Sequence, residues 1–98
     1  MLTLSLALLA ASTPALDAYV CLGSTARSIT ETRAAGREPE ARLLAAQTFW
    51  LEQVRPTVPN TADASLIEDA RVSRLDQPRR ANRRDLRRCL SQMPKAGN

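Results

Sequence analysis

Histidine is absent from this sequence, and aromatic residues and glycine are scarce, with one Phe, one Trp, one Tyr and three glycines. Without histidine, no imidazole can serve as a general acid or base, or bind a metal ion, near neutral pH. The chain also lacks a G-x-S-x-G segment, a P-loop, a dinucleotide-binding glycine pattern and a C-x-x-C pair. We therefore expect no catalytic activity, no metal site and no cofactor.

Residues 1–15 combine an apolar run with small and turn-forming residues, as a secretory signal peptide does. Thr13 and Ala15 stand at the −3 and −1 positions of its cleavage site. The run is too short to span a bilayer, which needs about 20 apolar residues. We expect a cleaved signal peptide over residues 1–15, a single domain over 16–98, and a periplasmic or secreted protein. Because no Lys or Arg precedes the run, two alternatives stay open: a start further upstream, and an apolar helix of the fold.

The two cysteines, Cys21 and Cys89, lie near opposite ends of the expected domain. A domain of this size buries only about 60% of its unfolded surface, so its core is marginal without a covalent link. In an oxidising compartment we expect one disulfide between them, worth roughly 4 kcal/mol in the loop-entropy description. If the chain is not exported, two separate buried thiols are the better interpretation.

Scarce glycine, prolines placed between segments and the lack of sustained apolar–polar alternation predict an all-α fold. We expect a small up-and-down bundle of three to four helices. The first helix should run from a cap at Asp17 to about Ala35, with Gly36 ending it. Gly23 and Ala26 should permit close contact with another helix. One face of this helix is shared by six residues: Ala18, Cys21, Leu22, Thr25, Ala26 and Ile29.

The second helix is expected to start at residue 38 or 39 and to end at Arg55, because Pro56 disfavours helix in the residue before it. As the most hydrophobic segment of the domain, it is predicted to be the central helix. Phe49 falls outside its apolar stripe, so either this helix is packed on two sides or Phe49 is an anchor for a partner. The stripe consists of Leu43, Ala46, Trp50 and Val54, widened by Leu44 and Leu51.

The remaining chain predicts two more helices. Residues 56–59 have the P-x-x-P form of a polyproline ligand, which we interpret as a linker between helices. The third helix should start at either Asn60 or Ser65, and the fourth should run from about Pro78 to Met93. Two apolar groups of the third helix point in different directions: Leu66, Ile67 and Ala70, against Val72 and Leu75.

Charge is divided unevenly along the chain. Residues 16–70 carry five arginines and eight acids, net −3, whereas residues 71–98 carry eight arginines, one lysine and two aspartates, net +7. In the fourth helix we expect Leu86, Cys89, Leu90 and Met93 to be buried and the arginines to face solvent. Six of them are candidate anion-binding residues: Arg79, Arg80, Arg83, Arg84, Arg87 and Arg88.

This arrangement is unfavourable in an isolated helix. Like charges four residues apart cost about 0.2–0.5 kcal/mol per pair, and Arg79 and Arg80 stand at the positive end of the helix dipole. Acids from residues 16–70, together with Asp85 paired to Arg88, would balance the charge internally. An anionic ligand would balance it from outside.

Four short features follow one another along the chain: Cys21, Phe49-Trp50-Leu51, Arg55-Pro56 and Arg88-Cys89. Their order resembles a group of small exported single-disulfide helical proteins of Gram-negative bacteria. Members of that group carry an aromatic-aromatic-Leu-Gly-Arg segment in the middle helix, where this chain has Glu52-Gln53 in place of Gly-Arg. The resemblance implies the helical fold and the disulfide, and it carries no function.

The sequence as a whole predicts a small exported interaction protein of the cell envelope, without catalytic activity or a transmembrane span. Its partner would be another protein or an anionic envelope component. The alternative function is binding of anionic ligands through the arginine-rich last helix. Those ligands would be lipid head groups or lipopolysaccharide, and nucleic acid only if the chain is not exported.

Overall fold

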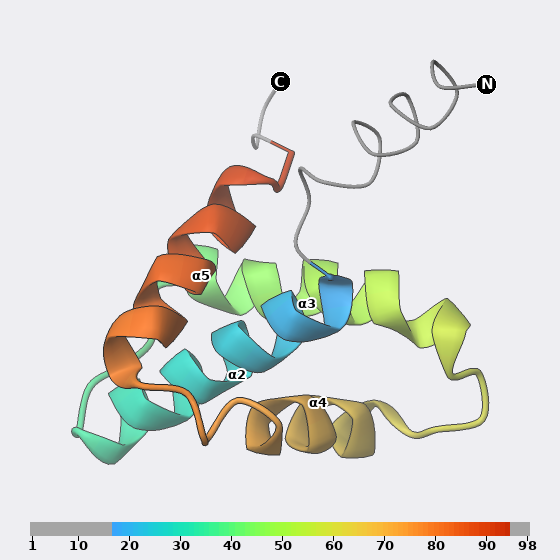
Figure 1. Ribbon diagram of the computed structural model, residues 1–98, viewed down its shortest axis with the longest axis horizontal. Helices are drawn as coiled ribbons and strands as arrows, with labels where there is room; N and C mark the ends of the chain where they lie inside the picture. Colours follow the sequence, from blue (N-terminus) through green and yellow to red (C-terminus); the bar gives the residue numbers. More distant parts are fainter. Residues whose placement is uncertain (1–16, 95–98) are drawn as a thin grey trace, which may run out of the picture.

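The computed structural model describes residues 17–94, which form four α-helices and one short 3₁₀ helix (Figure 1). No strand occurs within these residues, and a disulfide bond links Cys21 to Cys89. The expected all-α bundle with one disulfide is confirmed. The signal peptide expected at residues 1–15 lies outside the described part of the chain, as do residues 95–98. The elements are α2 (Ala18–Ala34), α3 (Ala41–Val54), η1 (Arg55–Thr57), α4 (Asp63–Val72) and α5 (Arg79–Ser91).

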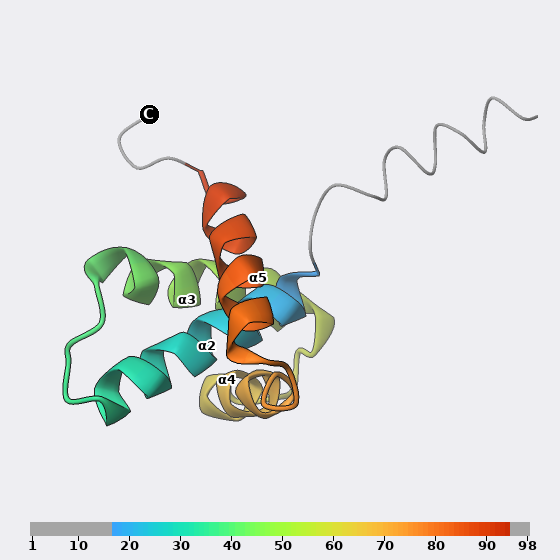
Figure 2. The ribbon, with the colours of Figure 1, turned by 60° about the vertical axis from the view of Figure 1, so that its left-hand side comes forward.

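Helix α2 is the centre of the bundle, because α3, α4 and α5 all pack against it. Helices α2, α3 and α4 alternate in direction, and α5 crosses α2 steeply (Figure 1, Figure 2). Residues 21–27 of α2 are buried without interruption, so the helix is covered on nearly all sides. The prediction that the second helix is central is therefore wrong. A central helix needs small side chains on several sides, which α2 has at Gly23, Ser24 and Ala26.

Both ends of α2 are fixed by local chemistry, as expected. The Asp17 carboxylate accepts a hydrogen bond from the backbone N–H of Tyr19 at 2.8 Å, which caps the first turn. At the other end Gly36 has a φ of +78°, the left-handed conformation that glycine adopts without steric cost.

Gly23 brings α2 into backbone contact with α4. A Cβ atom at this position would overlap the carbonyl oxygen of Ala70 and would lie 2.7 Å from Cγ of Arg74. The close helix contact expected at Gly23 is confirmed, and it leaves no room for a larger residue.

Helix α3 begins at Ala41, later than predicted, with Glu40 as its N-cap. Pro39 is buried just before the helix, so it serves as the entry to α3 instead of its first residue. The apolar stripe is narrower than predicted, because α2 covers only one side of α3. Its buried members are Ala46, Trp50, Leu51 and Val54, whereas Leu43 is half-buried and Leu44 is 38% exposed.

The link after α3 turns through η1, which contains Pro56, so the linker interpretation of residues 56–59 is confirmed. Helix α4 then begins at Asp63, between the two predicted starts, with Ala62 as its N-cap. Asp63 favours this start because its carboxylate lies in the first turn of the helix, near the positive end of the dipole. The two apolar groups separate as predicted: Leu66 and Ala70 are buried and Ile67 is half-buried, whereas Val72 and Leu75 are about half exposed.

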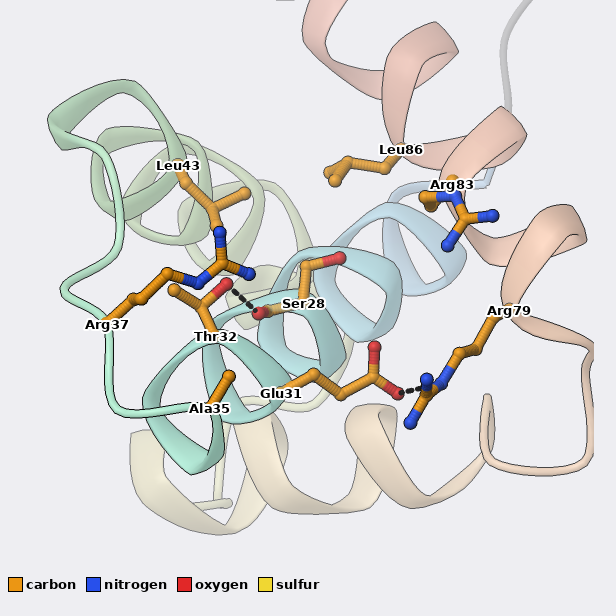
Figure 3. Close-up of a pocket in the computed structure, with 9 residues that line it drawn as sticks. All are labelled: Ser28, Glu31, Thr32, Ala35, Arg37, Leu43, Arg79, Arg83 and Leu86. Carbon is orange, nitrogen blue, oxygen red and sulfur yellow. Dashed lines mark hydrogen bonds and ion pairs between the residues drawn. The ribbon is translucent and has the colours of Figure 1, made fainter.

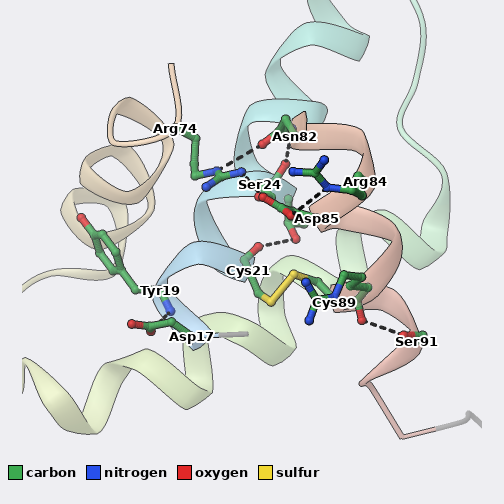
Figure 4. The surroundings of a disulfide bond; sticks show 12 residues. Asp17, Tyr19, Cys21, Ser24, Arg74, Asn82, Arg84, Asp85, Cys89 and Ser91 are labelled. Atoms are coloured by element: carbon green, nitrogen blue, oxygen red, sulfur yellow. Dashed lines mark hydrogen bonds and ion pairs between the residues drawn. A yellow bond between two sulfur atoms is a disulfide. The ribbon is translucent and has the colours of Figure 1, made fainter. Parts of the chain in front are cut away.

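Helix α5 is joined to α2 by the disulfide, whose two Cα atoms are 5.5 Å apart (Figure 4). Both cysteines are fully buried. The prediction that Leu86, Leu90 and Met93 are buried as well is wrong, since all three are only half-buried. The cause is the steep crossing of α5, which leaves open space between α5 and α3. Within residues 17–94, no helix is both long and apolar enough to cross a membrane.

Candidate functional site

Six arginines form the exposed surface of α5, which we call the arginine face. On the opposite side of the helix, Asn82 and Cys89 are buried against α2. The disulfide fixes Cys89 of α5 against Cys21 of α2. It therefore sets the rotation of α5 about its own axis and directs the arginines toward solvent. The arginines face solvent as expected, and their role in binding stays a prediction. The face consists of Arg79, Arg80, Arg83, Arg84, Arg87 and Arg88.

Asp85, the acid within α5, does not pair with Arg88 as expected. Its carboxylate accepts a hydrogen bond from Arg74 at 2.5 Å and lies 3.8 Å from Nε of Arg84. The physical reason is the direction of the side chain: Asp85 faces the α4 side of the bundle, where Arg74 is nearly buried. The shortest contact of the Asp85 carboxylate is thus with Arg74, a residue outside the arginine face.

Glu31 of α2 is the other acid that reaches the arginine face within the described residues. Its Oε2 lies 3.9 Å from Nε of Arg79, but the same oxygen accepts a shorter hydrogen bond, 2.9 Å, from Arg27. Internal compensation by acids is therefore confined to long contacts with Arg79 and Arg84. Of the six arginines of this face, four form no side-chain ion pair or hydrogen bond within residues 17–94: Arg80, Arg83, Arg87 and Arg88.

A buried polar network lies beneath the arginine face and links α2, the turn after α4, and α5 (Figure 4). Arg27 donates from Nη1 to the carbonyl oxygens of Arg74, at 2.7 Å, and Gln77, at 2.8 Å. Asn82 accepts from Arg74 Nε and donates to the carbonyl oxygen of Ser24, both at 3.4 Å. These bonds and the Arg74–Asp85 pair satisfy two arginines that are more than 90% buried.

Sequence reasoning missed the burial of Arg27 and Arg74. Arginine is rarely buried unless it is paired, and most partners of these two are distant in sequence. The i,i+4 spacing of Arg27 and Glu31 was the one local signal.

Arg79 and Arg83 also line a pocket of about 390 Å³ between α2, α5 and the start of α3 (Figure 3). Arg37, from the loop after α2, reaches into the same pocket from across it. Three positive side chains from two separate parts of the chain therefore line one cavity. The rest of the lining comprises Ser28, Glu31 and Thr32 of α2, Ala35 just after it, Leu43 of α3 and Leu86 of α5.

A second, largely apolar groove of about 780 Å³ lies between the start of α3 and the end of α5. Leu90 and Met93 form one wall, which explains why neither is fully buried. Ala41 and Ala45 line the α3 side, and Arg42 crosses to donate to the carbonyl oxygen of Leu90 at 3.3 Å.

Phe49, the candidate partner anchor, is half-buried and packs against the core. Its ring meets that of Trp50 edge-to-face, with centroids 4.8 Å apart. It lines neither the pocket nor the groove, and its role as an anchor stays a prediction. No group of three or more Cys, Asp or Glu within residues 17–94 is placed to hold a metal ion.

Two further acids are engaged by arginines away from α5. Asp63 accepts two hydrogen bonds from Arg55, and this hydrogen bonding raises the pKa of Arg55. Glu68 is bonded in the same way by Arg71, and the hydrogen bonds from Arg71 lower the pKa of Glu68. The carboxylates of both acids are thus held away from the arginine face.

Comparison of the chain with known protein families, curated proteins and solved structures finds no match. The resemblance to small exported single-disulfide proteins stays a prediction, and function is inferred from the geometry alone.

Proposed function

We propose that this protein is a small exported interaction protein of the cell envelope, without catalytic activity, that binds an anionic partner through its arginine face. The observation that carries the proposal is the lack of internal partners for Arg80, Arg83, Arg87 and Arg88 within the described residues. Other arginines of the same domain, such as Arg55 and Arg71, each hold an acid through two hydrogen bonds.

The physical basis is the energy of the unbound face. Arginines four residues apart repel each other, and those in the first turn of α5 also oppose the helix dipole. An anionic surface removes both costs when it binds, and guanidinium groups are well suited to carboxylates and phosphates because they can donate two parallel hydrogen bonds. The partner is therefore an acidic protein surface or a phosphate-bearing envelope component, such as lipid head groups or lipopolysaccharide.

The test is sedimentation of the oxidised protein with anionic vesicles, and with an acidic polypeptide, over a series of salt concentrations. We expect binding at low salt that weakens as salt rises, because exposed charges are screened. Replacing Arg80, Arg84 and Arg87 with Gln should abolish binding while the helical content is preserved.

A matched control removes the same amount of charge elsewhere. Replacing Arg33, Arg55 and Arg71 with Gln takes three positive charges from α2, η1 and α4, and exposed ion pairs of this kind contribute only about 0–1 kcal/mol each. This control should retain most of the binding. Binding that persists unchanged in the Arg80/Arg84/Arg87 variant, or no binding at low salt to either anion, would refute the proposal.

A further inference from the structure

We infer that the pocket between Arg37, Arg79 and Arg83 binds a phosphate monoester, with its phosphate on the arginines and its organic group against Leu43 and Leu86. This inference rests on the proposed function, since Arg79 and Arg83 belong to the arginine face and the inference names the group that they hold. It adds a residue outside α5, Arg37, and a defined cavity to what is otherwise an open charged surface.

Charge balance in the pocket favours a dianion. The side chains of Arg37 and Arg83 form no ion pair or hydrogen bond within the described residues. Glu31 does not neutralise these two, because its carboxylate is bonded to the buried Arg27 and otherwise makes only a long contact, 3.9 Å, with Arg79. A phosphate monoester carries a charge of about −1.5 to −2 near pH 7, whereas a carboxylate carries only one negative charge.

The hydrogen-bond donors are arranged around the cavity. Arg79 and Arg83 are four residues apart on α5, about 6 Å along its axis, and Arg37 lies across from them (Figure 3). Ser28 adds a hydroxyl: its Oγ accepts from Asn82 at 3.4 Å and donates to no other group within residues 17–94. Its proton is thus available to a phosphate oxygen, alongside the guanidinium groups.

The apolar part of the lining indicates an organic phosphate. Leu43 and Leu86 are both half-buried, and Ala35 adds a third apolar side chain to the lining. The volume of about 390 Å³ lies within the range of about 300–1,000 Å³ typical of sites for small organic ligands. Inorganic phosphate would leave these apolar side chains uncovered.

The first arm of the test uses phenyl phosphate as a soluble probe in an NMR titration of the oxidised protein. We expect saturable shifts of the Ser28 and Thr32 amide signals, which report on the pocket floor. Arg37→Gln should raise the dissociation constant about tenfold, the effect of losing one charge-assisted hydrogen bond. The matched control is Arg33→Gln, which removes the same charge from an exposed residue that does not line the pocket.

Further probes test which chemical groups of the ligand the pocket recognises. Benzoate and inorganic phosphate should bind more weakly than phenyl phosphate, because the first lacks a second charge and the other lacks the ring. Binding should also weaken between pH 7 and pH 5, since the probe gains a proton near pH 6.

The second arm distinguishes a lipid from a soluble ligand, using vesicles of phosphatidylcholine with and without phosphatidic acid. Vesicle binding that requires phosphatidic acid and is weakened by Arg37→Gln but not by Arg33→Gln assigns the pocket to a lipid head group. An effect of Arg37→Gln on phenyl phosphate alone assigns it to a soluble phosphate. Both results support the inference.

The inference is overturned if Arg37→Gln and Arg33→Gln behave alike with both probes. The proposed function would survive that result if the Arg80/Arg84/Arg87 variant still lost vesicle binding. Conversely, phosphate binding in the pocket that is unaffected by that triple variant, with no vesicle or polypeptide binding at all, would refute the function and leave the pocket assignment standing.

Discussion

The contact between Gly23 and α4 makes a strong prediction about stability. In Gly23→Ala the added methyl group would overlap the carbonyl oxygen of Ala70 and lie 2.9 Å from its carbonyl carbon. Non-bonded carbon atoms normally sit about 3.5–4.0 Å apart. The Arg74 side chain is buried and bonded to Asn82 and Asp85, and the Ala70 backbone can move only if α4 shifts away from α2.

Two effects of opposite sign determine how much Gly23→Ala changes the unfolding free energy. Ala is favoured over Gly in a helix interior by about 1 kcal/mol, whereas forcing an extra methyl group into a packed interface costs about 1–3 kcal/mol. Because this contact is with backbone, we place the packing cost of Gly23→Ala at the upper end. The net loss of unfolding free energy should be about 2 kcal/mol.

The assay is urea unfolding of the oxidised protein followed by far-UV circular dichroism. With a slope of about 1 kcal/mol per molar urea, as in small domains, the midpoint should fall by about 2 M. Thr30→Ala is the matched control, because Thr30 is exposed on the same helix and Ala there should stabilise by several tenths of a kcal/mol. If Gly23→Ala stabilises the protein as Thr30→Ala does, the close approach of α4 to α2 is refuted.

Cys89→Ser should lower the unfolding free energy by about 2–5 kcal/mol in urea titrations, and an unchanged midpoint would contradict the stabilising role of the disulfide. NMR titration should show the pKa of Glu68 below its ordinary value and rising in Arg71→Gln, because the hydrogen bonds from Arg71 favour the carboxylate. Stability from this pair should be present above the unfolded pKa of about 4.3 and be lost as pH falls through the folded pKa. Intact-mass measurement of protein from its native host should give a chain that begins at Leu16, and an uncleaved chain would refute export.

Features set by local chemistry could be predicted from the sequence. Asp17 and Gly36 mark the ends of α2 because a cap and a left-handed glycine act within a few residues. The disulfide followed from a chain with only two cysteines. Helix positions were therefore right to within a few residues, although the order of packing was not.

Features that depend on distant partners could not be predicted. The carbonyl oxygens that bind Arg27 belong to Arg74 and Gln77, and nothing in the sequence near residue 27 indicates them. The pocket could not be predicted for the same reason, because Arg37 and Arg83 line one cavity only after α5 has crossed α2. Charge counting located the arginine face but not the cavity at its edge.

The bonds from Arg27 to Arg74 and Gln77 bear on how the protein folds. Helix α4 has ten residues, fewer than an isolated helix needs to be stable in water. The carbonyl oxygens just beyond its C-terminal end are satisfied by a side chain nearly fifty residues earlier. The turn into α5 also has a local backbone bond, from Gln77 N–H to the Arg74 carbonyl oxygen, but the two bonds from Arg27 form only when α2 is already in place. The last third of the domain should form and melt together with α2, in one cooperative transition.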